Sequence, residues 1–190
     1  LVGESGCGKS ATLLSLVDLL PPPGIIEPQS RIRFEDTEVV GANEETLQKI
    51  RGDRIAMIFQ EPSASFNPLL RVGRQVGETL VIHHHAEREA SEKRAQELLD
   101  AVQIPEAEQR SADYPFQLSG GMLQRAMIAQ ALSGEPDILL ADEPTTSLDV
   151  TTQAQILGLI RDINASRNMA VLFVTHDLAL VSGFADRVLI

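Results

Sequence analysis

Apolar and polar positions follow two rhythms along the chain, and each rhythm predicts one kind of element. Apolar residues that recur every three or four positions predict amphipathic helices over about 10–20, 75–82, 86–102, 119–133, 151–165 and 178–184. Asn43 can cap a further short helix over 44–51. Short apolar runs predict buried strands over 54–60, 137–141 and 169–174, and the alternating stretch 30–40 predicts short, exposed antiparallel strands. The segments 63–70 and 111–118 are expected to be loops.

Strands separated by helices imply a parallel sheet that is covered on both faces, so the pattern predicts an α/β fold with flanking helices and a small antiparallel portion. The stretch 71–134 interrupts this alternation because it is almost entirely helical. We interpret it as a helical subdomain inserted into a core made of residues 1–70 and 135–190. A last strand is expected to start at Val188. Since the chain opens at a strand end and stops inside an apolar run, we expect one domain, 1–190, truncated at both ends and lacking its first strands.

Composition narrows the class of protein without indicating a chemistry. The 190 residues are a one-domain length that can bury a sizeable core. The net charge of −11, from 16 basic and 27 acidic side chains, argues against nonspecific nucleic-acid binding, which needs a basic face. A single cysteine rules out an internal disulfide framework. No apolar run approaches the roughly 18 residues of a membrane span.

The start of the chain contains a pattern typical of phosphate-binding loops. Residues 3–10, GESGCGKS, match G-x-x-x-x-G-K-[ST] and lie between an apolar strand end and a helical pattern. The glycines let successive N–H groups point at one anion, and the following helix directs the positive end of its dipole at the same place. Lys9 would place a compact charge on the outer phosphates, and Ser10 would offer a hydroxyl to Mg²⁺. The alternative, a glycine-rich turn that caps a helix, is disfavoured because both the strand and the helix required by the motif are present.

Polar residues directly follow the predicted strands. Asp142 and Glu143 end the run that starts at Ile138, His176 follows the strand 169–174, and Gln60 ends the strand 54–60. The carboxyl ends of parallel strands face the ligand crevice of an open α/β sheet. Asp142 is then placed to hold Mg²⁺ through water, and Glu143 to polarise an attacking water. His176 suits a γ-phosphate and the amide of Gln60 suits Mg²⁺ or water, although the acids alone are also compatible with a solvated turn and the histidine with a structural role.

Three further features have a functional and a structural interpretation. Ser119-Gly120-Gly121 opens the predicted helix 119–133, where free N–H groups can bind an anion, but an ordinary serine cap explains the same residues. A second phosphate-binding helix start makes sense if it serves the nucleotide of another subunit. The run His83-His84-His85 favours a solvated helix end over a metal site, because consecutive helical residues point in different directions. Cys7 is interpreted as a small filler within the glycine-rich loop.

Together these residues resemble the ATPase subunits of ATP-binding cassette (ABC) transporters. Residues 3–10 match the Walker A motif, Gln60 the Q-loop, residues 118–122 (LSGGM) the signature motif, and residues 138–142 with Glu143 the Walker B motif and its catalytic glutamate. Ser147-Leu148-Asp149 matches the D-loop and His176 the switch histidine. The motifs occur in the order found in that family and cover nearly the whole chain.

The sequence within and between these motifs is similar to that of the oligopeptide/dipeptide (peptide/nickel) permease group of the family. This narrower resemblance rests on FQEP at 59–62, FNP at 66–68, Tyr114-Pro115, Met122 and EPTTSLDV at 143–150. The group also includes importers of nickel, glutathione and other small solutes. The resemblance implies a P-loop NTPase-type fold and the ATP-binding and hydrolysing subunit of an importer that powers uptake of peptides or related small solutes.

The same resemblance implies a role for each motif residue, with ATP and Mg²⁺ as cofactors. Lys9, Gln60, Glu143 and His176 would be catalytic, and the ligands of Mg²⁺ would be Ser10, Gln60 and Asp142. ATP would bind between two domains that face each other head to tail. Its contacts would be Gly3, Glu4, Ser5, Gly6, Cys7, Gly8, Lys9, Ser10 and Ala11 of one domain, and Ser119, Gly120, Gly121 and Asp149 of the other, with Asp149 signalling across the dimer.

The implied partners are a second ABC ATPase domain, identical or related, and transmembrane permease subunits contacted through the segment 61–77. A solute-binding protein would act indirectly, no nucleic acid is expected, and the implied location is peripheral, on the cytoplasmic face of the inner (plasma) membrane. One alternative is a non-transport ABC ATPase of DNA repair or translation, but zinc cysteine pairs, long heptads and a second cassette are not visible. A catalytically inactive nucleotide-binding regulator is a further alternative, against which the intact Lys9, Asp142, Glu143 and His176 argue.

Overall fold

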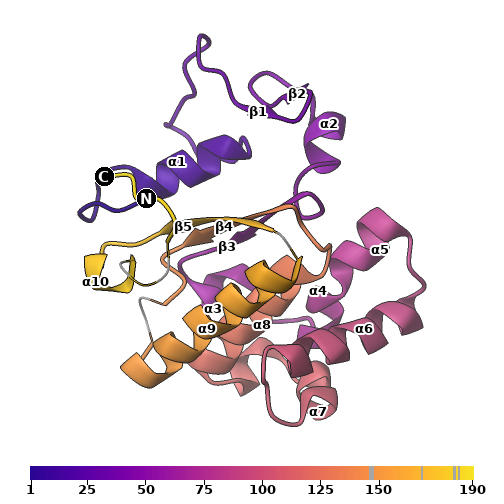
Figure 1. Ribbon diagram of the computed structural model, residues 1–190. Coiled ribbons are helices and arrows are strands. Elements are labelled where there is room, and N and C mark those ends of the chain that lie inside the picture. The colour runs from indigo at the N-terminus through magenta and orange to yellow at the C-terminus, as the bar shows by residue number, and fades with distance from the viewer. Residues whose placement is uncertain (146–147, 168, 182, 184) are drawn as a thin grey trace.

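A three-stranded parallel sheet forms the centre of the computed structural model, which describes residues 1–145, 148–167, 169–181, 183 and 185–190 (Figure 1). Its strands are β3 (Ile55–Ile58), β4 (Ile138–Asp142) and β5 (Ala170–Val174), in the order β3-β4-β5. The register pairs Ile55 with Ile138 and Ile138 with Ala170. All three strands were predicted from their apolar runs.

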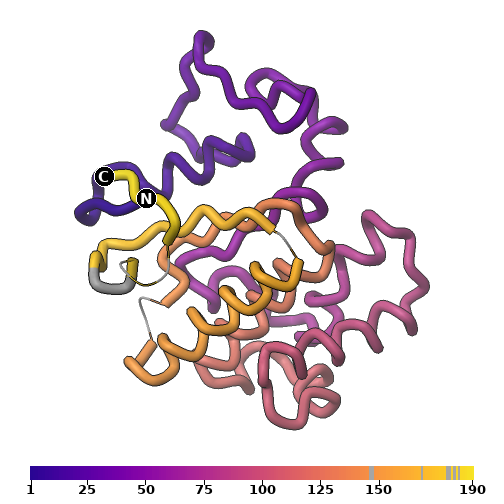
Figure 2. The backbone as a smooth tube through the Cα atoms, viewed as in Figure 1, coloured from indigo at the N-terminus to yellow at the C-terminus, as the bar shows by residue number. Residues whose placement is uncertain are grey.

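The first residues of the chain continue this sheet beside β5. Val2 forms a parallel bridge with Thr175, and its N–H donates to the carbonyl of Leu189 over 2.8 Å. The two ends of the chain therefore lie side by side (Figure 2). The prediction of a strand from Val188 onward was wrong, because residues 188–190 form no regular strand. Among the described residues, the backbone of this segment accepts the one hydrogen bond from Val2.

Alternate residues of the strands pack against two separate apolar clusters, one on each face of the sheet. On one face Leu140 and Val174 join Leu13 of α1 (Lys9–Leu16) and Val17, which follows that helix. On the other face Leu139, Ala141 and Phe173 join a larger cluster built from the helices below the sheet. Because successive side chains of a strand point to opposite faces, each short apolar run covers both clusters, as expected for a buried parallel strand.

A small antiparallel unit lies on the α1 side of the sheet (Figure 1). It consists of β1 (Arg33–Phe34) and β2 (Thr37–Glu38), followed by α2 (Glu44–Gln48). Asn43 caps α2, since its Oδ1 accepts from the N–H of Thr46 over 2.9 Å. The predicted antiparallel portion is therefore confirmed.

Five helices from the middle of the sequence lie together at one end of the molecule (Figure 1). They are α4 (Val72–Val76), α5 (Glu78–His84), α6 (Arg88–Ala101), α7 (Ala107–Ala112) and α8 (Gly120–Leu132). Two glycines allow close packing among them: a Cβ on Gly73 would lie 2.9 Å from the carbonyl oxygen of Ser111, and a Cβ on Gly77 2.8 Å from that of Ser91.

Two of the loops expected from the sequence contain short helices. Pro62–Ser65 forms α3, and the expected loop 111–118 contains the end of α7 (Ala107–Ala112) and a turn of 3₁₀-helix, η1 (Pro115–Gln117). Each of these elements buries only one or two side chains, so the apolar periodicity that identifies longer helices is absent from them. Only packing against neighbouring helices makes such short turns stable.

The last two helices follow β4 and β5. α9 (Val150–Arg167) covers the sheet together with α8, and α10 (Leu178–Val181) forms part of the predicted helix 178–184, of which Ser182 and Phe184 lie outside the described residues. No helix in the part of the chain that the structure describes combines the length and apolar character needed to cross a membrane.

Candidate functional site

The carboxyl ends of β4 and β5 meet the first turn of α1 at one edge of the sheet. β4 ends at Asp142 with Glu143 next in the chain, and β5 is followed by Thr175 and His176. Lys9 begins α1. Four of the residues singled out from the sequence, spread over some 170 positions, are thus brought to one place.

The backbone of the loop before α1 has a shape that favours glycine. Gly6 and Gly8 have φ angles of 83° and 99°, in the left-handed region where a side chain is strained. Gly8 is the N-cap of α1, and no side chain there accepts a hydrogen bond from the helix. The first N–H groups of α1 therefore remain available to an anion, as the motif predicts.

Lys9 folds back over its own loop. Its Nζ donates to the carbonyls of Gly3 and Glu4, each over 2.9 Å, and lies 3.7 Å from Oε1 of Glu143. Only 6% of Lys9 is exposed. A nearly buried ammonium needs several partners, and here two carbonyls and one carboxylate supply them.

Glu143 lies between Lys9 and His176. Its Oε2 is 3.0 Å from Nδ1 of His176, and its backbone N–H donates to the carbonyl of Val174 over 3.0 Å. The φ angle of Glu143 is 44°, which is uncommon for a residue with a side chain and costs on the order of 1 kcal/mol. This backbone strain turns the carboxylate away from the strand direction and toward the lysine and the histidine.

Asp142 has the surroundings of a cation ligand. It is 4% exposed, and burial raises the pKa of its carboxyl; the hydroxyl of Ser10 and the charge of Lys9 lower that pKa, and the charge of Glu143 raises it. Its Oδ1 is buried and has no hydrogen-bond partner among the described residues. An unpartnered buried carboxylate oxygen beside a serine hydroxyl is a donor set that fits Mg²⁺, which prefers hard oxygen ligands. Ser10 and Asp142 therefore fit the predicted metal site.

Gln60 stands apart from this cluster. It is exposed at the bend that follows β3, and no hydrogen bond or ion pair joins it to Lys9, Asp142 or Glu143 in the described part of the chain. Its predicted place at the end of a strand is approximately right, because β3 ends two residues earlier, at Ile58.

The signature residues lie elsewhere in the fold. Ser119 caps α8, its Oγ accepting from the N–H of Met122 over 3.3 Å. α8, which follows Ser119, and α1, which begins at Lys9, cover opposite faces of the sheet (Figure 1). The structural interpretation of this helix start is therefore confirmed, since Ser119 is an ordinary serine cap, and its role toward the nucleotide of another subunit stays a prediction.

Asp149 caps the neighbouring helix α9. Its Oδ1 accepts from the N–H groups of Thr151 and Thr152 over 3.0 and 3.1 Å, and its Oδ2 accepts from the hydroxyl of Thr152 over 2.7 Å. The hydrogen bond from the Thr152 side chain is the main reason why the pKa of Asp149 is lowered. Thr146 and Ser147, which belong to the predicted motif around Asp149, lie outside the described residues.

The structure adds one residue that the sequence reasoning missed. Thr175 is buried, and its hydroxyl accepts from the N–H of Asp177 over 3.0 Å, so it fixes the turn that presents His176. A threonine directly before a histidine at a strand end was the available signal. In the histidine run 83–85, Nε2 of His84 lies 2.7 Å from Oδ1 of Asp53, an ion-pair geometry that links α5 to the loop before β3.

Comparison with known proteins gives one consistent family. The family model described as ABC transporter matches residues 1–146. The chain is 48% identical over 189 residues to the oligopeptide transport ATP-binding protein OppD of Bacillus subtilis (strain 168), covering 99% of this chain and 52% of that protein. It is 50% identical over 188 residues to the peptidoglycan transport ATP-binding protein YejF of Agrobacterium fabrum (strain C58 / ATCC 33970), covering 99% of this chain and 34% of that protein.

A solved structure agrees with the sequence relatives. The dimeric structure of a post-hydrolysis state of the ATP-binding cassette MJ0796, bound to ADP and Pi, superposes with a TM-score of 0.81 at 32% identity, over 94% of this chain and 74% of that one. The chain spans about half the length of OppD and a third of YejF. Family match, high identity and shared P-loop fold lead to one conclusion: this chain belongs to the ABC transporter family.

Proposed function

We propose that the chain binds and hydrolyses ATP, and that it does so as the motor subunit of an importer for peptides or related small solutes. The observation that carries the proposal is the cluster at the edge of the sheet, where Glu143 contacts both Lys9 and His176 beside the buried Asp142. A cation for phosphates, a general base and a group that orients the base are the parts that phosphoryl transfer to water requires.

Metal binding is assigned to Ser10 and Asp142, with Gln60 as a further ligand that must approach from its exposed position at the end of β3. Bound Mg²⁺ supplies charge neutralisation for the phosphate oxygens. The unpartnered Oδ1 of Asp142 supports this assignment, because a buried carboxylate oxygen without a donor is costly unless a cation occupies the space beside it.

The remaining steps belong to side chains of this chain. The loop of residues 3–11 cradles the phosphates with its N–H groups, and Lys9 turns from the Gly3 and Glu4 carbonyls toward them. Glu143 then accepts a proton from the attacking water. His176, held 3.0 Å from Glu143, orients that carboxylate and contacts the terminal phosphate.

A second cassette completes the site in this proposal. In support, α8 and α9, which begin after Ser119 and Asp149, join the apolar cluster on the opposite face of the sheet from α1. The relative MJ0796 was solved as a dimer. We propose a head-to-tail pair, with an identical or a related second domain, that closes on ATP and opens after hydrolysis.

Transport requires partners in a membrane. We propose that permease subunits bind through residues 61–77, with residues 71–134 acting as a helical signature subdomain on the core 1–70 and 135–190, and that a solute-binding protein acts on the permease. The chain would then lie peripherally on the cytoplasmic face of the membrane. The relatives named for oligopeptide and peptidoglycan transport support an importer of peptide-like solutes.

The test is ATP hydrolysis by the full-length protein, as wild type and as Glu143→Gln, with and without its permease subunits in lipid. We expect hydrolysis that the permease stimulates, and a loss of at least about a hundredfold in the variant, the size typical of removing a general base. Hydrolysis that ignores the permease would contradict the transport role and favour the non-transport ATPases. Wild-type protein that binds but never hydrolyses ATP would contradict the catalytic assignment.

A further inference from the structure

One guanidinium group outside the nucleotide cluster joins three helices. Arg125 lies in the second turn of α8, and its Nη1 donates to the carbonyl of Val102, at the C-terminal end of α6, over 2.9 Å. Its Nη2 donates to Oε1 of Gln155 in α9 over 2.6 Å, and Nη1 lies 3.5 Å from Oε1 of Gln103. The Val102 carbonyl lies at the negative end of the α6 dipole, where a cation is favoured.

Two of these three helices, α8 and α9, follow the two motifs that are expected to meet a partner. α8 begins directly after Ser119, and α9 begins directly after Asp149. Gly121 packs against the start of α9, since a Cβ placed on it would lie 3.6 Å from Cγ2 of Thr152. α8 and α9 therefore run in the same direction side by side, and Arg125 joins them about one turn below the signature residues.

We propose that Arg125 is a positioning residue, which fixes the signature residues 119–121 relative to Asp149 so that both approach a second cassette in one register. The proposal rests on the head-to-tail pairing described above. A planar guanidinium presents its donors in fixed directions, whereas the donors of a lysine ammonium rotate at the end of a flexible stem. The contacts of Arg125 thus set an angle between α6, α8 and α9 rather than only a distance.

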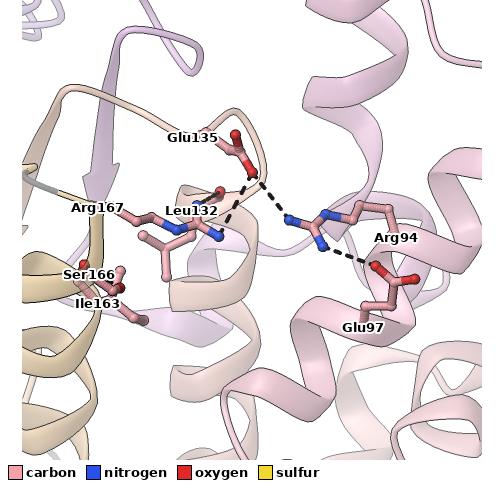
Figure 3. Close-up of polar contacts among 7 residues, drawn as sticks. All are labelled: Arg94, Glu97, Leu132, Glu135, Ile163, Ser166 and Arg167. Atoms are coloured by element: carbon pink, nitrogen blue, oxygen red, sulfur yellow. Dashed lines mark hydrogen bonds and ion pairs between the residues drawn. The ribbon is translucent and has the colours of Figure 1, made fainter.

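The opposite end of α8 provides a matched comparison (Figure 3). There the carboxylate of Glu135, just beyond α8, lies 3.2 Å from Arg94 of α6 and 3.9 Å from Arg167 of α9, and Arg167 also donates to the carbonyl of Leu132 over 3.4 Å. The same three helices are joined, but far from the signature residues. Glu135 is 63% exposed, so its ion pairs contribute little to stability.

The test uses the full-length protein in the Glu143→Gln background, where ATP is bound without turnover. Sedimentation equilibrium gives the dimer Kd with ATP, and fluorescence titration gives the affinity of the monomer for ADP. We expect Gln155→Leu to raise the dimer Kd about three- to tenfold, the range for one net hydrogen bond, and Arg125→Ala to raise it further. Arg125→Lys should recover part of the loss, because it keeps a donor for Val102.

Two measurements distinguish positioning from general damage. ADP affinity should stay unchanged in all these variants, since Arg125 and Gln155 do not touch the P-loop, and Glu135→Gln should leave the dimer Kd unchanged. Gln155 is exposed, so Gln155→Leu removes the acceptor without threatening the core.

Three outcomes would overturn the proposal: an unchanged dimer Kd in Gln155→Leu and Arg125→Ala, an equal rise in Glu135→Gln, or a parallel fall in ADP affinity. If the Glu143→Gln reference itself stays monomeric with ATP, the pairing fails and the role of Arg125 fails with it. If the Glu143→Gln reference dimerises with ATP and the Arg125 and Gln155 variants dimerise equally well, the role of Arg125 fails and the proposed function stands.

Discussion

At the scale of single residues, the site is a set of charges that hold one another in place. Lys9 contacts Glu143, Glu143 contacts His176, and Asp142 is buried beside them with one oxygen unpartnered. In the proposed function, Glu143 and His176 are already held together before nucleotide binds, which lowers the reorganisation that catalysis needs, whereas Lys9 still has to turn toward the phosphates. Asp149 is different, because its partners belong to its own helix, and this makes its contribution to folding measurable apart from nucleotide.

Asp149 gives a pH-dependent prediction. The hydrogen bond from Thr152 lowers its pKa in the folded state, so the carboxylate stabilises the fold above the unfolded value of about 3.9, and this stabilisation is lost as pH falls through the folded pKa. We expect Asp149→Ala to lower Tm at pH 7, with the difference shrinking below about pH 4. Thr152→Val should show part of the effect, while Thr152→Ser, which keeps the hydroxyl, should not. A Tm difference that is constant down to pH 3 would contradict this account.

At the scale of elements, the packing of the helices at one end of the molecule depends on how closely their backbones approach one another. α4 packs against α7 and α6 at Gly73 and Gly77, where a Cβ would contact backbone oxygens of Ser111 and Ser91. Ser91 also donates to the carbonyl of Gly77 over 2.8 Å, so the two helices are joined by a buried hydrogen bond at their closest point.

Two glycine substitutions therefore have opposite expected effects. Gly77→Ala forces α4 and α6 apart, and overpacking of this kind costs about 1–3 kcal/mol of unfolding free energy. Gly158→Ala lies in the interior of α9 with open space around it, and we expect it to stabilise the protein by about 0.5–1 kcal/mol. Chemical denaturation of both variants checks the pair. Stabilisation by Gly77→Ala would show that the helices separate freely.

At the scale of the whole molecule, the larger apolar cluster runs without a break from the helical end into the sheet. It includes Leu99 of α6 together with Leu139 of β4 and Phe173 of β5. A continuous cluster couples the helical end of the molecule to β4, which ends at Asp142, and to β5, which ends two residues before His176, so that the two parts should unfold together.

Leu99→Ala tests this coupling. Leu99 is fully buried, and its truncation should cost about 2–5 kcal/mol. Native-state hydrogen exchange should show the most protected amides of α6 and of β4 becoming faster by similar factors. If α6 alone loses protection, the helical end is a separate folding unit.

The sequence by itself determined the elements with a strong period and the chemistry of the motifs. The buried strands, the longer helices and the P-loop follow from local rules: apolar runs, caps such as Asn43 and Ser119, and glycines at positive φ. The short turns α3 and α7 were missed because one or two buried side chains leave no period to detect.

Only the tertiary structure decided which of these residues meet. Glu143 and His176, 33 positions apart, come together because β4 and β5 are paired in register, and Lys9 joins them because α1 packs on one face of that sheet. Packing on the opposite face brings the side chain of Arg125 in α8 into contact with the end of α6 and with α9. These contacts depend on strand register and helix packing across long separations in the chain, whereas the period of apolar residues reports only on neighbours within a turn or two.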